Sequence, residues 1–372
     1  MRIGFDITPL SVPQSGVGTY ALNLYEHLIQ ESNDQILPLI HRPLYHDGTI
    51  PQGCISPPGL AKRGMNKTLW MQAILPWQLI WQQVNVSHFT NSVAPLFVPG
   101  VSIVTIHDMT LWLFPQHHYR RRLLAMRPFI PLAARRAAAI VTVSHSAKED
   151  IVRILGVPPE KVAVVYEAPP PAFRPLLCND ILDHIRQKYH LPSRFILYVG
   201  TIEPRKNLVR LLEAFALLRQ RTSISHALLF VGSRGWKDEA VFAAVERFAL
   251  DGAVAFINHV PTSDLVALYN LADALAFPSL YEGFGLPVVE AMACGTPVIT
   301  SANGSLGEVA GDAAQFVEPT DVNSITDGLE QVLTSPTRQQ ELREHGLAHV
   351  SAFTWKATAT HTRELYAAVA GG

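Results

Sequence analysis

The sequence predicts an α/β protein made of two doubly wound units, each a parallel sheet with helices on both faces. Short runs rich in β-branched residues alternate with amphipathic helical windows along most of the chain, as in βαβ units. One proline-rich segment interrupts this alternation near the middle. A length of 372 residues also suits two domains of ~100 to 200 residues each.

In the first half, strands are expected at residues 2–7, 36–40, 84–88, 101–106, 140–143 and 161–166. Helical windows fit between several of these strands, and one such window is at residues 19–31. Another is expected to begin at Ser146, because Ser146 and Glu149 match the capping-box pattern. These elements predict a first unit over residues 1–168.

A stiff linker is expected at residues 169–177, which contain Pro169, Pro170, Pro171 and Pro175. The alternation then restarts over residues 178–352, with strands at 195–199, 227–231, 253–257, 274–277 and 297–300 and helices at 207–221 and 286–294. Residues 353–372 hold a last helix, at 355–369. Two such units leave a central cleft at the carboxyl ends of their strands, where α/β folds bind ligands.

The composition excludes several classes of protein. With 30 Lys and Arg against 31 Asp and Glu, the net charge of −1 gives no sign of nucleic-acid binding. Three cysteines are too few for a disulfide framework or a zinc site, which indicates a reducing compartment. No apolar run approaches the ~18 residues that span a bilayer, and the first ten residues do not match a signal peptide. We therefore expect a cytoplasmic protein.

The charge is unevenly distributed along the chain. Residues 48–148 contain ten Lys and Arg but only one acid, Asp108, so this stretch carries a net charge of +9. Within it, residues 62–81 combine bases with three tryptophans, and residues 117–136 interleave six arginines with apolar residues. This composition is typical of helices that rest on an anionic membrane surface. The alternative is an ordinary solvated face whose apolar side belongs to the core.

A first motif, Gly16-Val17-Gly18-Thr19-Tyr20-Ala21, fits the dinucleotide pattern G-x-G-x-x-A before a helix. That pattern needs a strand that runs directly into the turn, whereas residues 9–15 intervene and include two prolines. Gly16, Val17 and Gly18 are therefore interpreted as a ligand-binding loop, with a simple turn or a nicotinamide site as alternatives.

The second motif, at residues 199–207, follows the first strand of the second unit. Gly200 and Thr201 lead into Arg205 and Lys206, two adjacent cations just before a helix. A helix N-terminus already carries partial positive charge, so we expect a bound anion to relieve the repulsion. An exposed basic turn is the alternative.

The third motif, residues 282–290, begins and ends with a glutamate. Glycines at 283 and 285 free the backbone for close approach to a ligand, and Pro287 suits the first turn of a helix. Carboxylates accept hydrogen bonds from sugar hydroxyls, while amides at a helix start suit phosphate oxygens. This segment therefore predicts a site for a diphosphate and the sugars beside it.

The pair Glu282 and Glu290 matches the two-glutamate signature of retaining glycosyltransferases with the GT-B fold, which consists of two Rossmann-like domains. Together with residues 16–18, Arg205-Lys206 and the segment 294–299, it makes the chain similar to glycosyltransferase family 4 (glycosyl transferases group 1). The similarity covers nearly the whole chain. Its specific part is residues 278–300 with residues 200–207.

The resemblance implies roles for the motif residues. Glu290 would bind the nucleotide ribose, Glu282 the donor sugar, and Arg205 with Lys206 the departing diphosphate. His107, at the end of a strand, resembles the family's histidine near the reacting sugar, and residues 353–372 resemble a helix that crosses back to the first domain. The remaining donor-binding positions are Gly16, Val17, Gly18, Gly200, Thr201, Val260, Gly283, Phe284, Gly285 and Leu286.

The expected reaction is retaining transfer of a hexose from a UDP- or GDP-linked donor to a glycan or lipid-linked glycan. No Asp-x-Asp pair occurs, so no metal or other cofactor is expected, and cations with helix amides would stabilise the leaving diphosphate. A sugar-nucleotide hydrolase or epimerase, a nicotinamide oxidoreductase and a non-enzymatic scaffold remain as alternatives. The basic first half favours a lipid-linked or polymeric acceptor.

Overall fold

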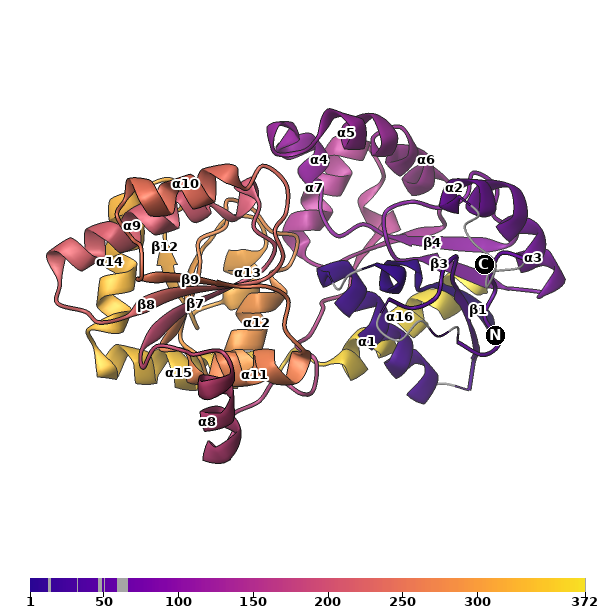
Figure 1. Cartoon of the computed structure of the whole chain (residues 1–372). Coiled ribbons are helices and arrows are strands. Elements are labelled where there is room, and N and C mark those ends of the chain that lie inside the picture. The colour runs from indigo at the N-terminus through magenta and orange to yellow at the C-terminus, as the bar shows by residue number, and fades with distance from the viewer. Residues whose placement is uncertain (13–14, 32, 46–48, 50, 59–65, 372) are drawn as a thin grey trace. The chain divides into compact units, whose positions relative to one another are not determined.

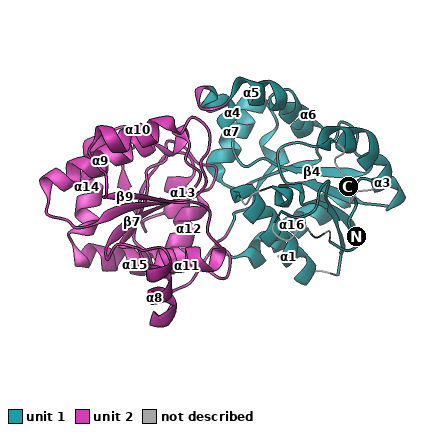
Figure 2. Cartoon of the chain, viewed as in Figure 1, with its two compact units in different colours: residues 1–115, 119–167, 354–372 teal, residues 116–118, 168–353 magenta. Residues whose placement is uncertain are grey.

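The computed structural model describes residues 1–12, 15–31, 33–45, 49, 51–58 and 66–371. It divides the chain into two compact units, drawn in teal and magenta in Figure 2. Unit 1 comprises residues 1–115, 119–167 and 354–372, and unit 2 comprises residues 116–118 and 168–353. The chain passes from unit 1 to unit 2 between Glu167 and Ala168, directly before the proline-rich segment. Its last residues return to unit 1.

Unit 1 is built on a six-stranded parallel sheet in the order β2-β1-β3-β4-β5-β6. Each predicted strand of the first half is present. Its sixth strand is shorter than the expected range 161–166, because Pro159–Lys161 form a 3-10 turn. The strands are β1 (Arg2–Asp6), β2 (Gln35–Leu39), β3 (Val86–Phe89), β4 (Val101–Thr105), β5 (Ala139–Thr142) and β6 (Val162–Val164).

The helices of unit 1 cover both faces of this sheet (Figure 1). Helices α1 and α16 pack against each other, while α3, α6 and α7 share a core of buried apolar residues on the other face. The helices are α1 (Gly16–Gln30), α2 (Lys67–Leu69), a π-helical turn η2 (Trp70–Ile74), α3 (Leu75–Trp81), α4 (Thr110–Leu113), α5 (Arg120–Met126), α6 (Phe129–Arg136), α7 (His145–Leu155) and α16 (Trp355–Ala370).

Two helix starts differ from the prediction, because each helix is capped by a serine that the sequence interpretation did not assign as a cap. Helix α1 begins at Gly16 and not at residue 19, since the Ser15 side chain accepts a hydrogen bond from the Gly18 amide. The expected capping box at Ser146 is wrong. Helix α7 begins one residue earlier, and the Ser144 hydroxyl accepts from the Ala147 amide. In both helices the capping side chain satisfies an amide that the first turn leaves without a helical partner.

Unit 2 repeats the architecture with a parallel sheet in the order β12-β11-β10-β7-β8-β9. The five strands predicted for this half are confirmed. A sixth, β12, was missed because its three residues at the sheet edge are too short to show a periodic pattern. The strands are β7 (Phe195–Val199), β8 (Ala227–Val231), β9 (Val254–Ile257), β10 (Ala274–Phe277), β11 (Val298–Ser301) and β12 (Gln315–Val317).

The helices of unit 2 also lie on both faces of their sheet. Helices α9, α10 and α14 lie on one face, and α11, α12 and α15 lie on the other (Figure 1). The helices are α8 (Asn179–Lys188), α9 (Leu208–Arg221), α10 (Glu239–Arg247), α11 (Thr262–Leu271), α12 (Leu286–Ala293), α13 (Leu306–Ala310), α14 (Val322–Leu333) and α15 (Pro336–Val350). Among the helices that the structure describes, none combines the length and apolar character needed to cross a bilayer.

The strand order of each sheet indicates the position at which a ligand is expected to bind. In unit 1 the connections change direction between β1 and β3, and in unit 2 between β7 and β10. Open parallel sheets bind ligands outside the carboxyl ends of the strands at such a switch point. The second and third sequence motifs follow β7 and β10, so the sheet of unit 2 brings them to one place.

Candidate functional site

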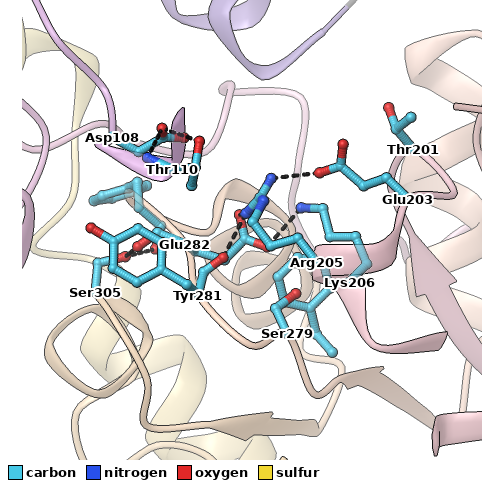
Figure 3. A network of polar contacts seen from close by, with 12 residues as sticks. Asp108, Thr110, Thr201, Glu203, Arg205, Lys206, Ser279, Tyr281, Glu282 and Ser305 are labelled. Atoms are coloured by element: carbon cyan, nitrogen blue, oxygen red, sulfur yellow. Dashed lines mark hydrogen bonds and ion pairs between the residues drawn. The ribbon is translucent and has the colours of Figure 1, made fainter. Parts of the chain in front are cut away.

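A cluster of four charged side chains lies at the switch point of unit 2. Glu282 stands between the two cations, and its Oε1 atom is 2.7 Å from Lys206 Nζ while its Oε2 atom is 2.6 Å from Arg205 Nη1 (Figure 3). Arg205 Nη2 also lies 2.7 Å from Glu203 Oε1. The sequence interpretation, which expected a bound anion to offset the two cations, did not foresee these carboxylate partners. Two glutamates of the chain itself neutralise the two cations.

The electrostatics of this cluster fix its charge state. Burial by itself raises the pKa of Glu282, but the positive charges of Arg205 and Lys206 and their hydrogen bonds outweigh it and lower that pKa to about 2. Burial lowers the pKa of Lys206 below 10.5, while Glu282 opposes the shift. The Lys206 ammonium also lies 4.9 Å from the centre of the Phe277 ring. Glu282 is therefore an ionised carboxylate throughout the neutral range.

Backbone contacts hold the loops after β7 and β10 together. The Leu280 amide donates to the Arg205 carbonyl at 2.9 Å, and Arg205 Nη1 donates to the Tyr281 carbonyl at 2.6 Å. Asn207 has a φ of 63°, in the left-handed region that asparagine tolerates, and its side-chain Nδ2 donates to the carbonyls of Pro278 and Pro319. Arg205 and Lys206 are thus carried on a turn fixed from both sides.

Gly200 and Thr201 lie at the carboxyl end of β7, as predicted. Gly200 has a φ of 145°, and a Cβ atom on the neighbouring Gly232 would lie 2.2 Å from the Gly200 carbonyl oxygen. The two strand ends therefore approach more closely than side chains would permit. The Tyr198 hydroxyl donates to the Thr201 carbonyl at 3.1 Å and supports this turn.

The second glutamate of the third motif has different surroundings. Glu290 lies inside α12, is 7% exposed, and accepts a hydrogen bond of 2.9 Å from the Tyr269 hydroxyl of α11. Burial, and then the negative charge of Glu290, raise the pKa of Tyr269 well above 10, so that this hydroxyl remains a donor. Glu282 and Glu290 thus differ in partner, one being held by cations and the other by a neutral phenol.

The loop between these glutamates is shaped by glycine and serine. Gly285 precedes α12 with a φ of 103°, and Pro287 lies in the first turn of α12, as predicted. Ser305 donates to the carbonyls of Glu282 at 3.1 Å and Phe284 at 2.8 Å. These bonds fix the predicted donor-binding segment, residues 283–286, against the start of α13. Val260 lies apart, between β9 and α11, and is buried.

In unit 1, His107 follows β4 and contacts groups at the ends of two other strands. Its Nδ1 atom is 3.2 Å from Glu167 Oε1, after β6, and its Nε2 atom is 2.9 Å from the Thr90 carbonyl oxygen, after β3. Burial lowers the pKa of His107, but the hydrogen bond and charge of Glu167 outweigh it, so the pKa is raised above 6.5. A carboxylate and a partly buried imidazole therefore share this edge of the sheet.

Gly16, Val17 and Gly18 form the first turn of α1 and not a loop before it, which corrects the sequence interpretation. The strand-to-helix turn of a dinucleotide site is also missing at this point, because the 3-10 turn Thr8–Ser11 follows β1. One residue beyond Thr19, the ring of Tyr20 meets that of His107 edge-on, with ring centres 4.8 Å apart. The start of α1 and His107 are thus neighbours within unit 1.

The structure brings the predicted residues into two groups. Arg205, Lys206 and Glu282 meet directly, with Gly200, Thr201 and the loop 283–286 on the same edge of the unit 2 sheet, while His107 and the start of α1 lie in unit 1. Sequence reasoning assigned no role to Glu203, Asn207, Tyr269 or Glu167, although each bonds to a predicted residue or fixes its loop. Glu203 and Asn207 had a visible signal, since both lie within the second motif, beside Arg205 and Lys206.

A metal site was not expected from the sequence. Within the described part of the chain, no three His, Cys, Asp or Glu side chains are arranged so that they could hold a metal ion together.

Comparisons with known proteins identify the family. The family described as "Glycosyl transferases group 1" matches residues 183–349, and that described as "Glycosyltransferase Family 4" matches residues 14–168. The O-antigen chain mannosyltransferase B of Escherichia coli is 30% identical over 380 residues, which cover 98% of this chain and 99% of that protein. The chain belongs to glycosyltransferase family 4. It is therefore a glycosyltransferase, and the nicotinamide and scaffold alternatives are set aside.

Solved structures confirm the GT-B fold. Sucrose-phosphate synthase from Thermosynechococcus elongatus is 20% identical with a TM-score of 0.77, covering 99% of this chain and 98% of that one. HepE from Anabaena, solved in complex with UDP-glucose, is 17% identical with a TM-score of 0.77, covering 99% of this chain and 100% of that one. At these identities the likeness concerns the fold alone.

Proposed function

We propose that this glycosyltransferase moves a mannosyl residue from a GDP-linked donor to a growing bacterial-type polysaccharide. The observation that carries the proposal is the ionised Glu282 held between Arg205 and Lys206 at the switch point of the unit 2 sheet. A carboxylate for sugar hydroxyls and two cations for a diphosphate are thus side by side. The choice of mannose follows the full-length similarity to the O-antigen mannosyltransferase.

The residue roles are part of this proposal. Arg205 and Lys206 neutralise the departing diphosphate, while Glu282 accepts hydrogen bonds from the donor sugar and holds both cations in place. Glu290, oriented by Tyr269, accepts from the ribose hydroxyls. Backbone at residues 283–286 and near Val260 completes the contacts to the donor.

The proposed reaction retains the configuration of the sugar. The bond between the anomeric carbon and the diphosphate oxygen breaks, the acceptor oxygen bonds to the same face, and the leaving diphosphate takes the acceptor proton. Fixed cations stabilise the leaving group as its charge develops, which is the catalytic contribution expected to be largest. We propose that no metal ion is required for this step.

A donor and acceptor assay tests the proposal. Purified protein is incubated with GDP-mannose or UDP-glucose, with and without a mannan oligosaccharide, and with EDTA or MnCl₂. We expect transfer from GDP-mannose that depends on acceptor, persists in EDTA, and gives an α-linked product from the α-donor by NMR. Steady donor consumption without acceptor would favour the hydrolase or epimerase alternative, and loss of activity in EDTA until Mn²⁺ is added would refute metal independence.

We also propose that unit 1 docks on an anionic bilayer, the cytoplasmic leaflet, where a lipid-linked acceptor would lie. Of the basic segment 62–81 expected from the sequence, Lys62 and Arg63 lie outside the described residues. The helical stretch 67–81 buries Trp70, Met71, Leu75 and Leu79 and turns an apolar face outward. The side chains on that outer face are Leu69 (56% exposed), Trp77 (60%), Ile80 (42%) and Trp81 (80%).

Hydrogen bonds connect this face to the arginine-rich helices. The Leu96 amide donates to Gln72 in the helical stretch, and Arg136 of α6 donates to the Leu96 carbonyl. Leu96 and Phe97 are themselves exposed, as are Leu124 of α5 and Arg120, Arg121, Arg122 and Arg135. Exposed aromatic residues beside fixed positive charge match the apolar interior and anionic surface of a bilayer.

Co-sedimentation with vesicles tests the docking surface. We expect binding to vesicles with 30% anionic lipid, weak binding to neutral ones, and loss of binding in Trp77→Ser/Trp81→Ser. The matched control is Leu177→Ser, which removes a side chain that is 96% exposed in unit 2. Equal binding of wild type and the double variant, or concentration-dependent self-association without vesicle binding, would contradict the proposal.

A further inference from the structure

Unit 1 contains two histidines, His88 on β3 and His107 just after the adjacent strand β4, whose hydrogen-bond partners differ in kind. His88 of β3 is fully buried, and its ring nitrogens lie 2.6 Å from the Tyr366 hydroxyl and 2.7 Å from the Thr105 hydroxyl. A hydroxyl can donate or accept, so these partners suit a neutral imidazole, which carries one donor and one acceptor. Burial, and then the nearby His107, lower the pKa of His88 to about 3.

His107 faces acceptors at both ring nitrogens. Glu167 Oε1 lies 3.2 Å from Nδ1, and the Thr90 carbonyl oxygen lies 2.9 Å from Nε2. A carbonyl oxygen never donates, and an ionised carboxylate only accepts. When Glu167 is ionised, only the doubly protonated imidazolium can donate to both.

The other charged and titratable groups around His107 also affect its protonation state. Asp108, the next residue, adds a second negative charge that favours protonation, while burial disfavours it. His88 stays neutral, and Tyr20, which meets the ring edge-on, keeps its proton because burial raises its pKa. The side chains of His107 and Glu167 are only 14% and 5% exposed, so water screens their attraction little.

We propose that Glu167 keeps His107 doubly protonated, so that His107 is a fixed positive charge and not a proton acceptor in the transfer reaction. Glu167 is then a positioning residue, since it acts through His107. The role of His107 in the transfer reaction rests on the function proposed above. The protonation state of His107 does not, because it is a property of unit 1 without substrate.

Histidine-selective NMR titration of the full chain tests the protonation state directly. His107 is assigned by comparison with His107→Gln, and its ring nitrogens are followed from pH 5.5 to 9.5. We expect the imidazolium at pH 7.5 in the wild type. In Glu167→Gln, which keeps an acceptor but removes the charge, we expect the midpoint to fall by at least about one pH unit. The control Glu160→Gln, an exposed glutamate of unit 1, should leave the midpoint unchanged.

Two results would overturn the inference. One is a neutral His107 at pH 7 in the wild type, with the proton on Glu167. The other is an unchanged midpoint in Glu167→Gln. If that variant does not fold, the wild-type titration still decides the question.

Transfer assays add a second readout. In the pH profile of kcat, we expect the midpoint of the fall at alkaline pH to be lower in Glu167→Gln. It should fall by the same number of pH units as the NMR midpoint, and KM for the donor should change less. A uniform loss of kcat at every pH would show a merely structural role for Glu167. If no transfer is found with any donor while the titration behaves as expected, the proposed function fails and the protonation state stands.

Discussion

The two units place charge at the carboxyl edges of similar sheets but hold it in different ways. In unit 2, Glu282 is bound by Arg205 and Lys206, which lower its pKa to about 2, so that it is ionised at neutral pH. In unit 1, Glu167 is bound by His107, a residue type whose unperturbed pKa lies near neutral pH, and this pairing raises the pKa of His107 above 6.5. The same parallel-sheet architecture thus carries a cluster of carboxylates with Arg and Lys in unit 2 and a carboxylate–histidine pair in unit 1.

Removal of Glu282 should have the largest effect. Glu282→Ala leaves Arg205 and Lys206 buried without their shared partner, and we expect unit 2 to lose about 3 to 5 kcal/mol of stability. Hydrogen exchange should then increase in peptides covering residues 200–207 and 278–290 but not in the sheet of unit 1. Lys206→Met added to Glu282→Ala should restore part of the loss, and the exposed Glu239→Ala is the control. An equal increase in hydrogen exchange in both units would contradict the expectation that Glu282 stabilises unit 2 selectively.

The two units should also respond to opposite ends of the pH scale. Folding lowers the pKa of Glu282 from 4.5 to about 2, so its contribution, about 3 kcal/mol, is complete above pH 4.5 and is lost as the pH falls towards 2. Folding raises the pKa of His107, so its contribution is complete below pH 6.5 and is lost at higher pH.

Thermal unfolding of wild type and Glu282→Gln between pH 7 and pH 3 measures the first of these contributions. The stability difference should be constant down to about pH 4.5 and shrink below it. A difference that stays constant to pH 3 would show that Glu282 is not stabilised as a carboxylate.

Loss of Lys206 should reduce catalysis by a smaller free energy. We expect Lys206→Ala to lower kcat at least about thirtyfold, or about 2 kcal/mol, because one cation facing the diphosphate is removed. Kinetics at saturating donor measure this loss, with Lys237→Ala as the exposed control in unit 2. Normal turnover in Lys206→Ala would remove this residue from the mechanism.

The smallest effect concerns the neutral histidine of unit 1. Tyr366→Phe deletes the hydroxyl that lies 2.6 Å from His88 Nδ1, and we expect a loss of about 1 kcal/mol in stability, the ordinary value for one buried hydrogen bond. Thermal unfolding measures it, and Tyr45→Phe, at a tyrosine that is 61% exposed, should change nothing. A loss as large as that of Glu282→Ala would mean that His88 is not neutral.

Local sequence patterns were sufficient to predict most of the secondary structure and part of the candidate site. The strand and helix periodicities predicted both sheets apart from β12, and Pro287 marked the first turn of α12. The pair Glu282 and Glu290 indicated the family, because a fixed spacing on one loop and one helix is visible along the chain. Serine caps were less certain, since both Ser144 and Ser146 are residues that suit a helix start and Ser144 is the one that caps α7.

The long-range partners of the charged residues were decided only by the tertiary structure. Glu282 is 77 residues from Arg205 and His107 is 60 residues from Glu167, and nothing in the intervening sequence indicates either pairing. The crossover connections bring the ends of parallel strands to one edge, so distant loops meet there. Glu282 and His107 thus acquire their partners Arg205, Lys206 and Glu167 from distant loops that the sheet brings together, while Glu203 and Asp108 contribute from neighbouring positions in the chain.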